Sequence, residues 1–281
     1  MTESTAALLQ QGLFHHRRGE IDLAMQRYTD VLRVNPQDAD ALYYIAVVAC
    51  KEGQFQQGIE LARRSLSFKP RQARAFNLIG QALHRQGDAK AALEYFDTAL
   101  DCDINFAEAY GNRANMLSAL GRHAEALSSF ERALALKPEA ATYLNRGATL
   151  SAMGRLDEAI ASFERASELD PEFALPHVNR AGALGEAGRW EEALAAYEKA
   201  LALAPTFAES HLGRASALFR LGRPEEALGA AERALELKDA LVPAHRLRGE
   251  ALEALGRSEE ARASFAKADA LAAQAAPAPP A

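Results

Sequence analysis

Eight glycines recur along the chain at an almost constant interval, and this period restricts the fold more than any other feature. They lie at positions 19, 53, 87, 121, 154, 188, 222 and 256, so six intervals are 34 residues long and one is 33. A period of this length is typical of stacked repeats that bury their faces against each other. We therefore divide the chain into eight repeats: 5–38, 39–72, 73–106, 107–139, 140–173, 174–207, 208–241 and 242–275.

Other positions of the repeat follow the same register when the glycine is numbered 15. Positions 8 and 20 are always small, position 24 is aromatic in six repeats, and position 32 is proline in five. Small residues let two helices approach closely, glycine ends the first helix in a left-handed conformation, and proline stops the second. Each repeat is therefore predicted to be a helix–turn–helix, which gives about sixteen helices in an open stack.

This pattern resembles the tetratricopeptide repeat (TPR) family over residues 5–275. The resemblance implies an all-α, right-handed superhelical solenoid of eight repeats, about one turn long, forming a single array over residues 1–275 with a concave groove. One departure is the arginine at position 7 of the last five repeats. These arginines are Arg113, Arg146, Arg180, Arg214 and Arg248. We interpret them mainly as ion-pair partners of the glutamates at position 25. The Ala/Pro segment 276–281 is predicted to be a disordered tail.

Composition and charge exclude several classes of function. The net charge of −6 argues against general binding of nucleic acid or of an anionic membrane surface. No apolar run approaches the roughly 20 residues that a transmembrane helix needs. The N-terminal residues lack the basic and apolar regions of a secretion signal, and two cysteines cannot form a disulfide framework. We therefore expect a cytoplasmic protein without nucleic-acid or membrane partners.

We find no catalytic or metal-binding motif in the sequence. A phosphate-binding glycine loop, a nucleophile elbow and a helical zinc-protease motif are all missing. His177, His211 and His245 share position 4 of successive repeats. Neighbouring helix axes lie roughly 8–10 Å apart, whereas zinc ligands lie about 2.0–2.1 Å from one ion, so we interpret these histidines as packing residues. We expect no enzymatic activity and no cofactor.

Three asparagines at position 6 are the most informative candidates for binding. In TPR arrays this position faces the concave groove. Asn112, Asn145 and Asn179 resemble the asparagine ladder in the repeat arm of O-linked N-acetylglucosamine transferases, which grips extended protein segments. An amide offers both a donor and an acceptor, so it can pair with a peptide backbone whatever the side chains are. The alternative is that they are polar groove residues without a ligand.

Positions 2, 5, 9, 12 and 13 are also taken as facing the groove. The candidate peptide-binding residues there, with their neighbours, are Tyr43, Lys51, Arg74, Asn77, Gln81, Arg85 and Asn115. The first three repeats are basic in these positions, the middle ones are small and apolar, and the last is partly acidic. A complementary ligand would be acidic at one end and apolar in its centre.

A carboxylate clamp of the kind found in chaperone-binding TPR modules is not predicted. Asn115 and Asn145 match two of its positions, but Gly111 stands where the clamp needs lysine. Leu175 and Asn179 occupy the places of its final basic pair. Binding of a chaperone C-terminus in this manner is therefore not expected.

The function predicted from the sequence is a protein-interaction scaffold that holds an extended peptide or partner segment in its groove. A second possibility is the substrate-recruiting arm of a glycosyltransferase-like enzyme whose catalytic part lies elsewhere. A third is a structural array that associates with itself, although we expect a monomer. The sequence does not identify the partner.

Overall fold

The computed structural model describes residues 4–275, and within this range the chain forms sixteen helices and no strand. The helices are α1 (Thr5–Arg17), α2 (Ile21–Val34), α3 (Ala39–Lys51), α4 (Phe55–Phe68), α5 (Ala73–Arg85), α6 (Ala89–Cys102), α7 (Ala107–Ala119), α8 (His123–Leu136), α9 (Ala140–Ala152), α10 (Leu156–Leu169), α11 (Ala174–Glu186), α12 (Trp190–Leu203), α13 (Ala208–Arg220), α14 (Pro224–Leu237), α15 (Val242–Ala254) and α16 (Ser258–Ala275). The predicted all-α fold of helix–turn–helix repeats is confirmed. The segment 276–281, predicted to be disordered, lies outside the described residues.

The periodic glycines end the first helix of each repeat. Their φ angles lie between 72° and 88°, a left-handed conformation that no other described residue adopts. At Gly87, for example, the amide donates to the carbonyl of His84, and the next amide, of Asp88, donates to that of Leu83. A Cβ built on Gly87 would meet no atom within 4 Å. Backbone conformation, and not lack of space, therefore requires glycine at this position.

Close packing of the two helices within a repeat explains the small residue at position 8. A Cβ on Gly80 would lie 2.6 Å from Cε1 of Phe96, and one on Gly147 would lie 2.5 Å from Cε1 of Phe163. Both aromatic rings are buried. The small residue and the aromatic at position 24 therefore interlock, as the sequence pattern predicts.

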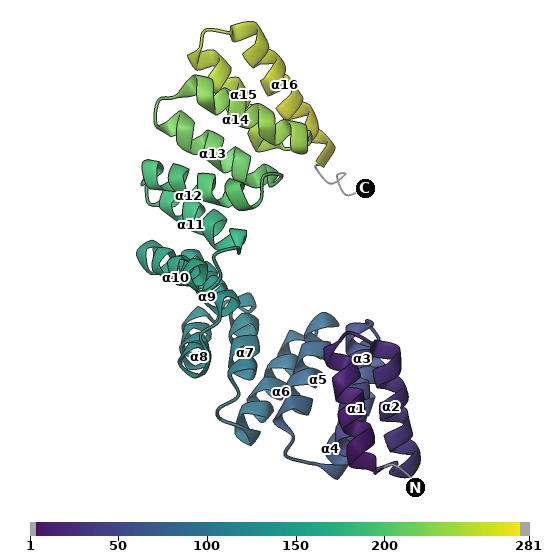
Figure 1. The fold of residues 1–281 in the computed structure, drawn as a ribbon. Helices are drawn as coiled ribbons and strands as arrows, with labels where there is room; N and C mark the ends of the chain where they lie inside the picture. Colours follow the sequence, from purple (N-terminus) through teal and green to yellow (C-terminus); the bar gives the residue numbers. More distant parts are fainter. Residues whose placement is uncertain (1–3, 276–281) are drawn as a thin grey trace, which may run out of the picture. The chain divides into compact units, whose positions relative to one another are not determined.

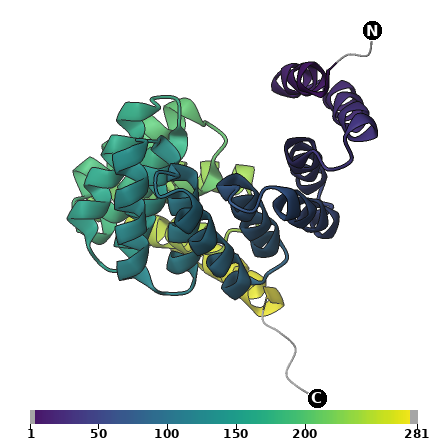
Figure 2. The same ribbon diagram turned by 90° about the horizontal axis from the view of Figure 1, so that it is seen from below.

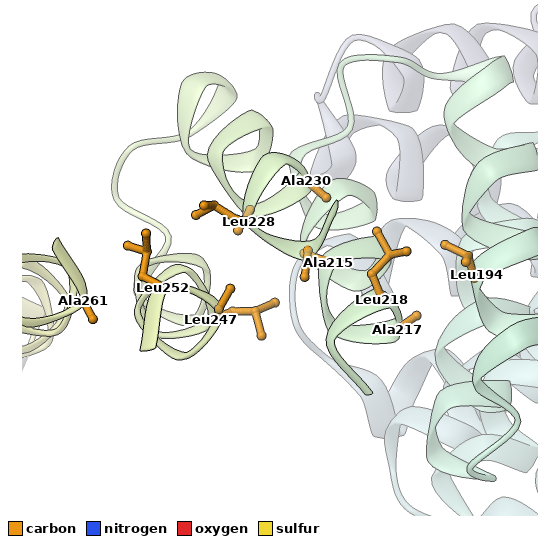
Figure 3. Close-up of a cluster of buried hydrophobic side chains, with 12 residues drawn as sticks. Leu194, Ala215, Ala217, Leu218, Leu228, Ala230, Leu247, Leu252 and Ala261 are labelled. Carbon is orange, nitrogen blue, oxygen red and sulfur yellow. The ribbon is translucent and has the colours of Figure 1, made fainter. Parts of the chain in front are cut away.

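The chain divides into two compact units after Pro138, which we call the N-terminal unit and the C-terminal unit. Within each unit the two helices of a repeat pack together and the second helix packs on the first helix of the next repeat (Figures 1 and 2). Figure 3 shows part of the core of the C-terminal unit, where Leu194, Leu218 and Leu252 come from three successive repeats. The single superhelical array over residues 1–275 stays a prediction.

The arginines at position 7 connect neighbouring helices. Arg113 Nε donates to Asp97 Oδ1 of the preceding repeat at 2.6 Å, and its Nη1 donates to Ser129 Oγ at 2.7 Å. Arg180 pairs with Glu164 of the preceding repeat at 2.7 Å. The structural interpretation of these arginines is therefore confirmed.

Candidate functional site

Most of the predicted binding residues of the N-terminal unit lie on the first helices of three repeats, α3, α5 and α7. A pocket of about 500 Å³ lies between α3 and α5, and one of about 310 Å³ lies between α5 and α7. Gln81 and Arg85 line both pockets, so the two are adjacent along one groove. Lys51 lines the α3–α5 pocket, and Asn112 and Asn115 line the α5–α7 pocket.

The α3–α5 pocket combines apolar walls with uncompensated positive charge. Val47, Phe55 and Leu78 line it from three successive helices. Lys51 and Arg85 are exposed at its edge, and among residues 4–275 neither has a carboxylate within ion-pair distance. An apolar side chain could therefore be buried here while its acidic neighbours meet two cations that have no carboxylate partner.

His16 of the first repeat lies next to this charge without neutralising it. Its Nε2 is 3.4 Å from Lys51 Nζ, and its Nδ1 is 3.2 Å from the hydroxyl of Tyr28. Burial, and then the charge of Lys51, lower the pKa of His16. The imidazole is therefore neutral near pH 7, and the positive charge of this part of the groove comes from the lysine.

A polar network along the groove involves three predicted residues and one that the sequence analysis missed. Asn77 is only 3% exposed, and its Nδ2 donates to Glu108 Oε1 at 3.0 Å. Gln81 Nε2 donates to the same oxygen at 2.9 Å, and Asn112 Nδ2 donates to Asn77 Oδ1 at 2.9 Å. Glu108 occupies position 2, which was already taken as facing the groove, so its carboxylate could have been identified from the sequence.

Arg74 and Tyr43, both predicted to bind peptide, are engaged within the fold. Arg74 donates to Asp40 and, at 3.0 Å, to the hydroxyl of Tyr44. Its guanidinium carbon lies 4.6 Å from the ring centroid of Tyr43. Burial raises the pKa of Tyr43 to about 12. These contacts join α3 to α5, and neither side chain lines the α3–α5 pocket.

The three asparagines of position 6 are distributed over the two units. Asn112 lies on α7 in the N-terminal unit, whereas Asn145 and Asn179 lie on α9 and α11 in the C-terminal unit. All three are half-buried. Their action as one ladder stays a prediction.

Two of the three histidines of position 4 bond to backbone. Nε2 of His211 lies 2.9 Å from the carbonyl oxygen of Pro205, and Nε2 of His245 lies 2.8 Å from that of Asp239. Nowhere in residues 4–275 do three histidine, cysteine or carboxylate side chains come together as metal ligands. In the same range, no helix is both long and apolar enough to span a membrane.

The repeat geometry agrees with comparisons to known families. Family models of the tetratricopeptide repeat match residues 9–67, 72–139, 105–172, 182–222 and 212–276. The chain belongs to the tetratricopeptide repeat family. Among curated relatives, anaphase-promoting complex subunit 3 of Schizosaccharomyces pombe is 28% identical over 131 residues, or 47% of this chain. The match spans only 20% of the length of that protein.

Solved structures share the TPR fold at low sequence identity. Pseudomonas aeruginosa pilF has a TM-score of 0.67 and 19% identity, and the match covers 76% of this chain and 98% of that one. YrrB, described as a TPR protein with an unusual peptide-binding site, has a TM-score of 0.58 and 20% identity over 65% of this chain and 95% of its own. At these identities the likeness establishes the fold alone.

Proposed function

We propose that this TPR protein is a protein-binding scaffold without catalytic activity, and that its N-terminal unit holds an extended acidic segment in the groove along α3, α5 and α7. The observation that carries the proposal is the pair Lys51 and Arg85 beside the apolar α3–α5 pocket. Both cations are exposed, and neither has an ion-pair partner among residues 4–275. The partner segment would place an apolar side chain in the pocket and carboxylates beside it.

The energetics favour this kind of ligand. Burying a leucine-sized side chain contributes roughly 1.5–3 kcal/mol. Exposed ion pairs add little each, about 0–1 kcal/mol, but they steer an acidic segment toward the groove and select it against a basic one. The side chains of Gln81 and Asn112 at the pocket walls retain acceptor oxygens that a peptide backbone N–H can reach.

A short fluorescein-labelled peptide tests the proposal, with one leucine flanked on each side by two glutamates. Its affinity is measured by fluorescence anisotropy for the wild type and for Lys51→Glu with Arg85→Glu. We expect binding that is weakened about tenfold or more in the double variant and by raising NaCl from about 50 to about 500 mM. The affinities of the single variants Lys51→Glu and Arg85→Glu are compared with that of Lys90→Glu. Lys90 is a suitable control because it is exposed on α6 and lines neither pocket. Equal affinity of wild type and double variant, or no binding to the wild type, would contradict the proposal.

The oligomeric state and cellular location complete the proposal. We propose a monomeric, cytoplasmic scaffold, which light scattering at rising protein concentration and cell fractionation would test. A mass that grows with concentration would favour the self-associating array. The glycosyltransferase-arm alternative rests on the asparagines of position 6, and Asn112 already has Asn77 as an internal partner.

A further inference from the structure

A second pocket lies in the C-terminal unit, at the place in the repeat that corresponds to the α3–α5 pocket. It has a volume of about 460 Å³ and lies among α11, α12, α13 and α15. Trp190 lines it at position 17, where Phe55 lines the pocket of the N-terminal unit. These are the only aromatic residues at position 17 in the eight repeats, apart from the histidine at 123. A bulky aromatic residue at position 17 is therefore a feature that the two pockets share.

Glycines shape this second pocket: one leaves open space, and two let aromatic rings pack closely. Gly182, Gly185 and Gly213 line it, and a Cβ built on Gly182 would meet no atom within 4 Å. A Cβ on Gly213 would lie 2.2 Å from Cζ of Tyr197. Glycine at 213 therefore lets the Tyr197 ring, which belongs to the preceding repeat, lie against α13 as a wall of the pocket. Trp190 completes the apolar walls together with Leu212.

The charge at the edge of this pocket is opposite to that of the N-terminal pocket. Glu186 and Glu250 line it, and among residues 4–275 neither has an ion-pair partner. Of the two arginines nearby, Arg246 pairs with Asp269 at 3.3 Å, whereas the guanidinium of Arg220 lies 5.7 Å from the Trp190 ring centroid, a contact that leaves its positive charge in place. Position 13, which is Lys51 in the second repeat, is Glu186 here. Among the described residues, two unpaired carboxylates against one unpaired guanidinium leave a net negative charge at this pocket.

We propose that the C-terminal unit binds a second kind of protein segment, one that presents a bulky apolar side chain flanked by lysine or arginine. The apolar side chain enters the space left by Gly182, beside the Trp190 ring, which itself packs against Gly185. The flanking cations meet Glu186 and Glu250. This site is separate from the acidic-segment site proposed for the N-terminal unit, and either can exist without the other.

Trp190 is the only tryptophan of the chain, so its fluorescence reports occupancy of this pocket directly. The probe is a short, tryptophan-free peptide with one phenylalanine flanked by lysines, titrated into the millimolar range. We expect a saturable change in emission, with at least about tenfold weaker binding by two matched peptides. One has glutamates in place of the lysines, and the other has alanine in place of the phenylalanine.

A pair of glycine substitutions locates the binding. Gly182→Leu places a side chain in the pocket, whereas Gly229→Leu makes the same change on α14, where a Cβ also meets no atom within 4 Å. Both should fold, because neither position has a close neighbour, and circular dichroism verifies this. We expect Gly182→Leu to weaken binding of the lysine-flanked peptide at least about tenfold and Gly229→Leu to leave it unchanged.

The charge requirement is tested by Glu186→Gln with Glu250→Gln, which should reduce the preference for the lysine-flanked over the glutamate-flanked peptide without changing the fold. Several results would overturn the proposal: no emission change with the lysine-flanked peptide, equal binding of all three peptides, or equal affinity of the wild type and Gly182→Leu. None of these results bears on Lys51 and Arg85, which lie in the other unit.

Discussion

Asn112 Nδ2 donates a hydrogen bond to Asn77 Oδ1 at 2.9 Å, and this bond joins the first helices of two neighbouring repeats. Asn77 is buried and donates in turn to Glu108. A residue that sequence analysis assigned to a ligand is therefore part of the fold's own polar network. Its remaining capacity for a peptide lies mainly in its acceptor oxygen.

Replacing Asn112 by alanine should therefore lower the free energy of unfolding by about 1–3 kcal/mol, because it leaves a buried acceptor on Asn77 unpaired. Asn179→Ala is the matched control from the same repeat position. No hydrogen bond from the Asn179 side chain is found within the described residues, so its loss should be close to neutral. Urea unfolding followed by circular dichroism measures both, and equal effects would show that the bond to Asn77 contributes nothing.

The glycines of the first helices should respond to alanine in opposite ways. Gly80→Ala places a Cβ 2.6 Å from the Phe96 ring and 3.1 Å from the carbonyl oxygen of Ala92, so we expect a loss of about 1–3 kcal/mol. Gly111→Ala meets no atom within 4 Å and should stabilise α7 by roughly 0.5–1 kcal/mol, because alanine restricts the unfolded chain. Thermal unfolding distinguishes the two, and a stabilising Gly80→Ala would contradict the interlocked packing.

The arginine at position 7 should matter more than an arginine on the surface. Arg113 bonds to Asp97 on α6 and to the buried Ser129 on α8, so Arg113→Ala should cost about 1–2 kcal/mol. Arg122 forms an exposed pair with Glu125 three residues later, and Arg122→Ala should cost about 0–1 kcal/mol. Chemical denaturation of both variants at the same salt concentration tests the difference. Identical midpoints would mean that the arginines at position 7 do not stabilise the stack.

Stability should fall as the pH falls through the histidine range. The pKa of His16 is lowered in the folded state, so the unfolded chain binds the proton more readily. The stability that the neutral His16 contributes is therefore complete above the pKa of histidine in the unfolded chain. It is lost as the pH drops toward the lower pKa of His16 in the folded protein. We expect a lower melting temperature at about pH 5.5 than at about pH 7.5, and a smaller difference in His16→Gln. An unchanged difference in that variant would exclude His16 as a source.

The sequence predicted the fold well because its strongest signals are backbone and steric requirements. The glycine at position 15 needs a positive φ, and the small residue at position 8 touches an aromatic ring. Both requirements therefore appear in the sequence as the same kind of residue at the same position of every repeat. The site was predicted less completely, because a position in the repeat shows on which face of the helix a side chain lies but not which residue it bonds to. Arg74 bonds to Asp40 and Tyr44, and Glu108 accepts from Asn77, through contacts that depend on side-chain conformation.

The C-terminal pocket shows the same distinction. Gly182 belonged to the small, apolar middle of the predicted groove, which agrees with the pocket that it lines. The orientation of Tyr197 toward Gly213 of the next repeat has no signature in the repeat pattern, since position 24 usually packs within its own repeat. The aromatic residue at position 17, which the sequence analysis did not use, is a signal that both pockets share.

The central claim is that partners bind in the groove, and site-specific photocrosslinking in the native host tests it most directly. A benzophenone amino acid replaces Gln81, which lines both pockets of the N-terminal unit, or Glu94, which is exposed on α6 and lines neither. We predict a discrete crosslinked partner from position 81 that is lost in the background of Lys51→Glu with Arg85→Glu, and none from position 94. The same crosslinked partner from both positions, unaffected by the charge reversals, would contradict the account.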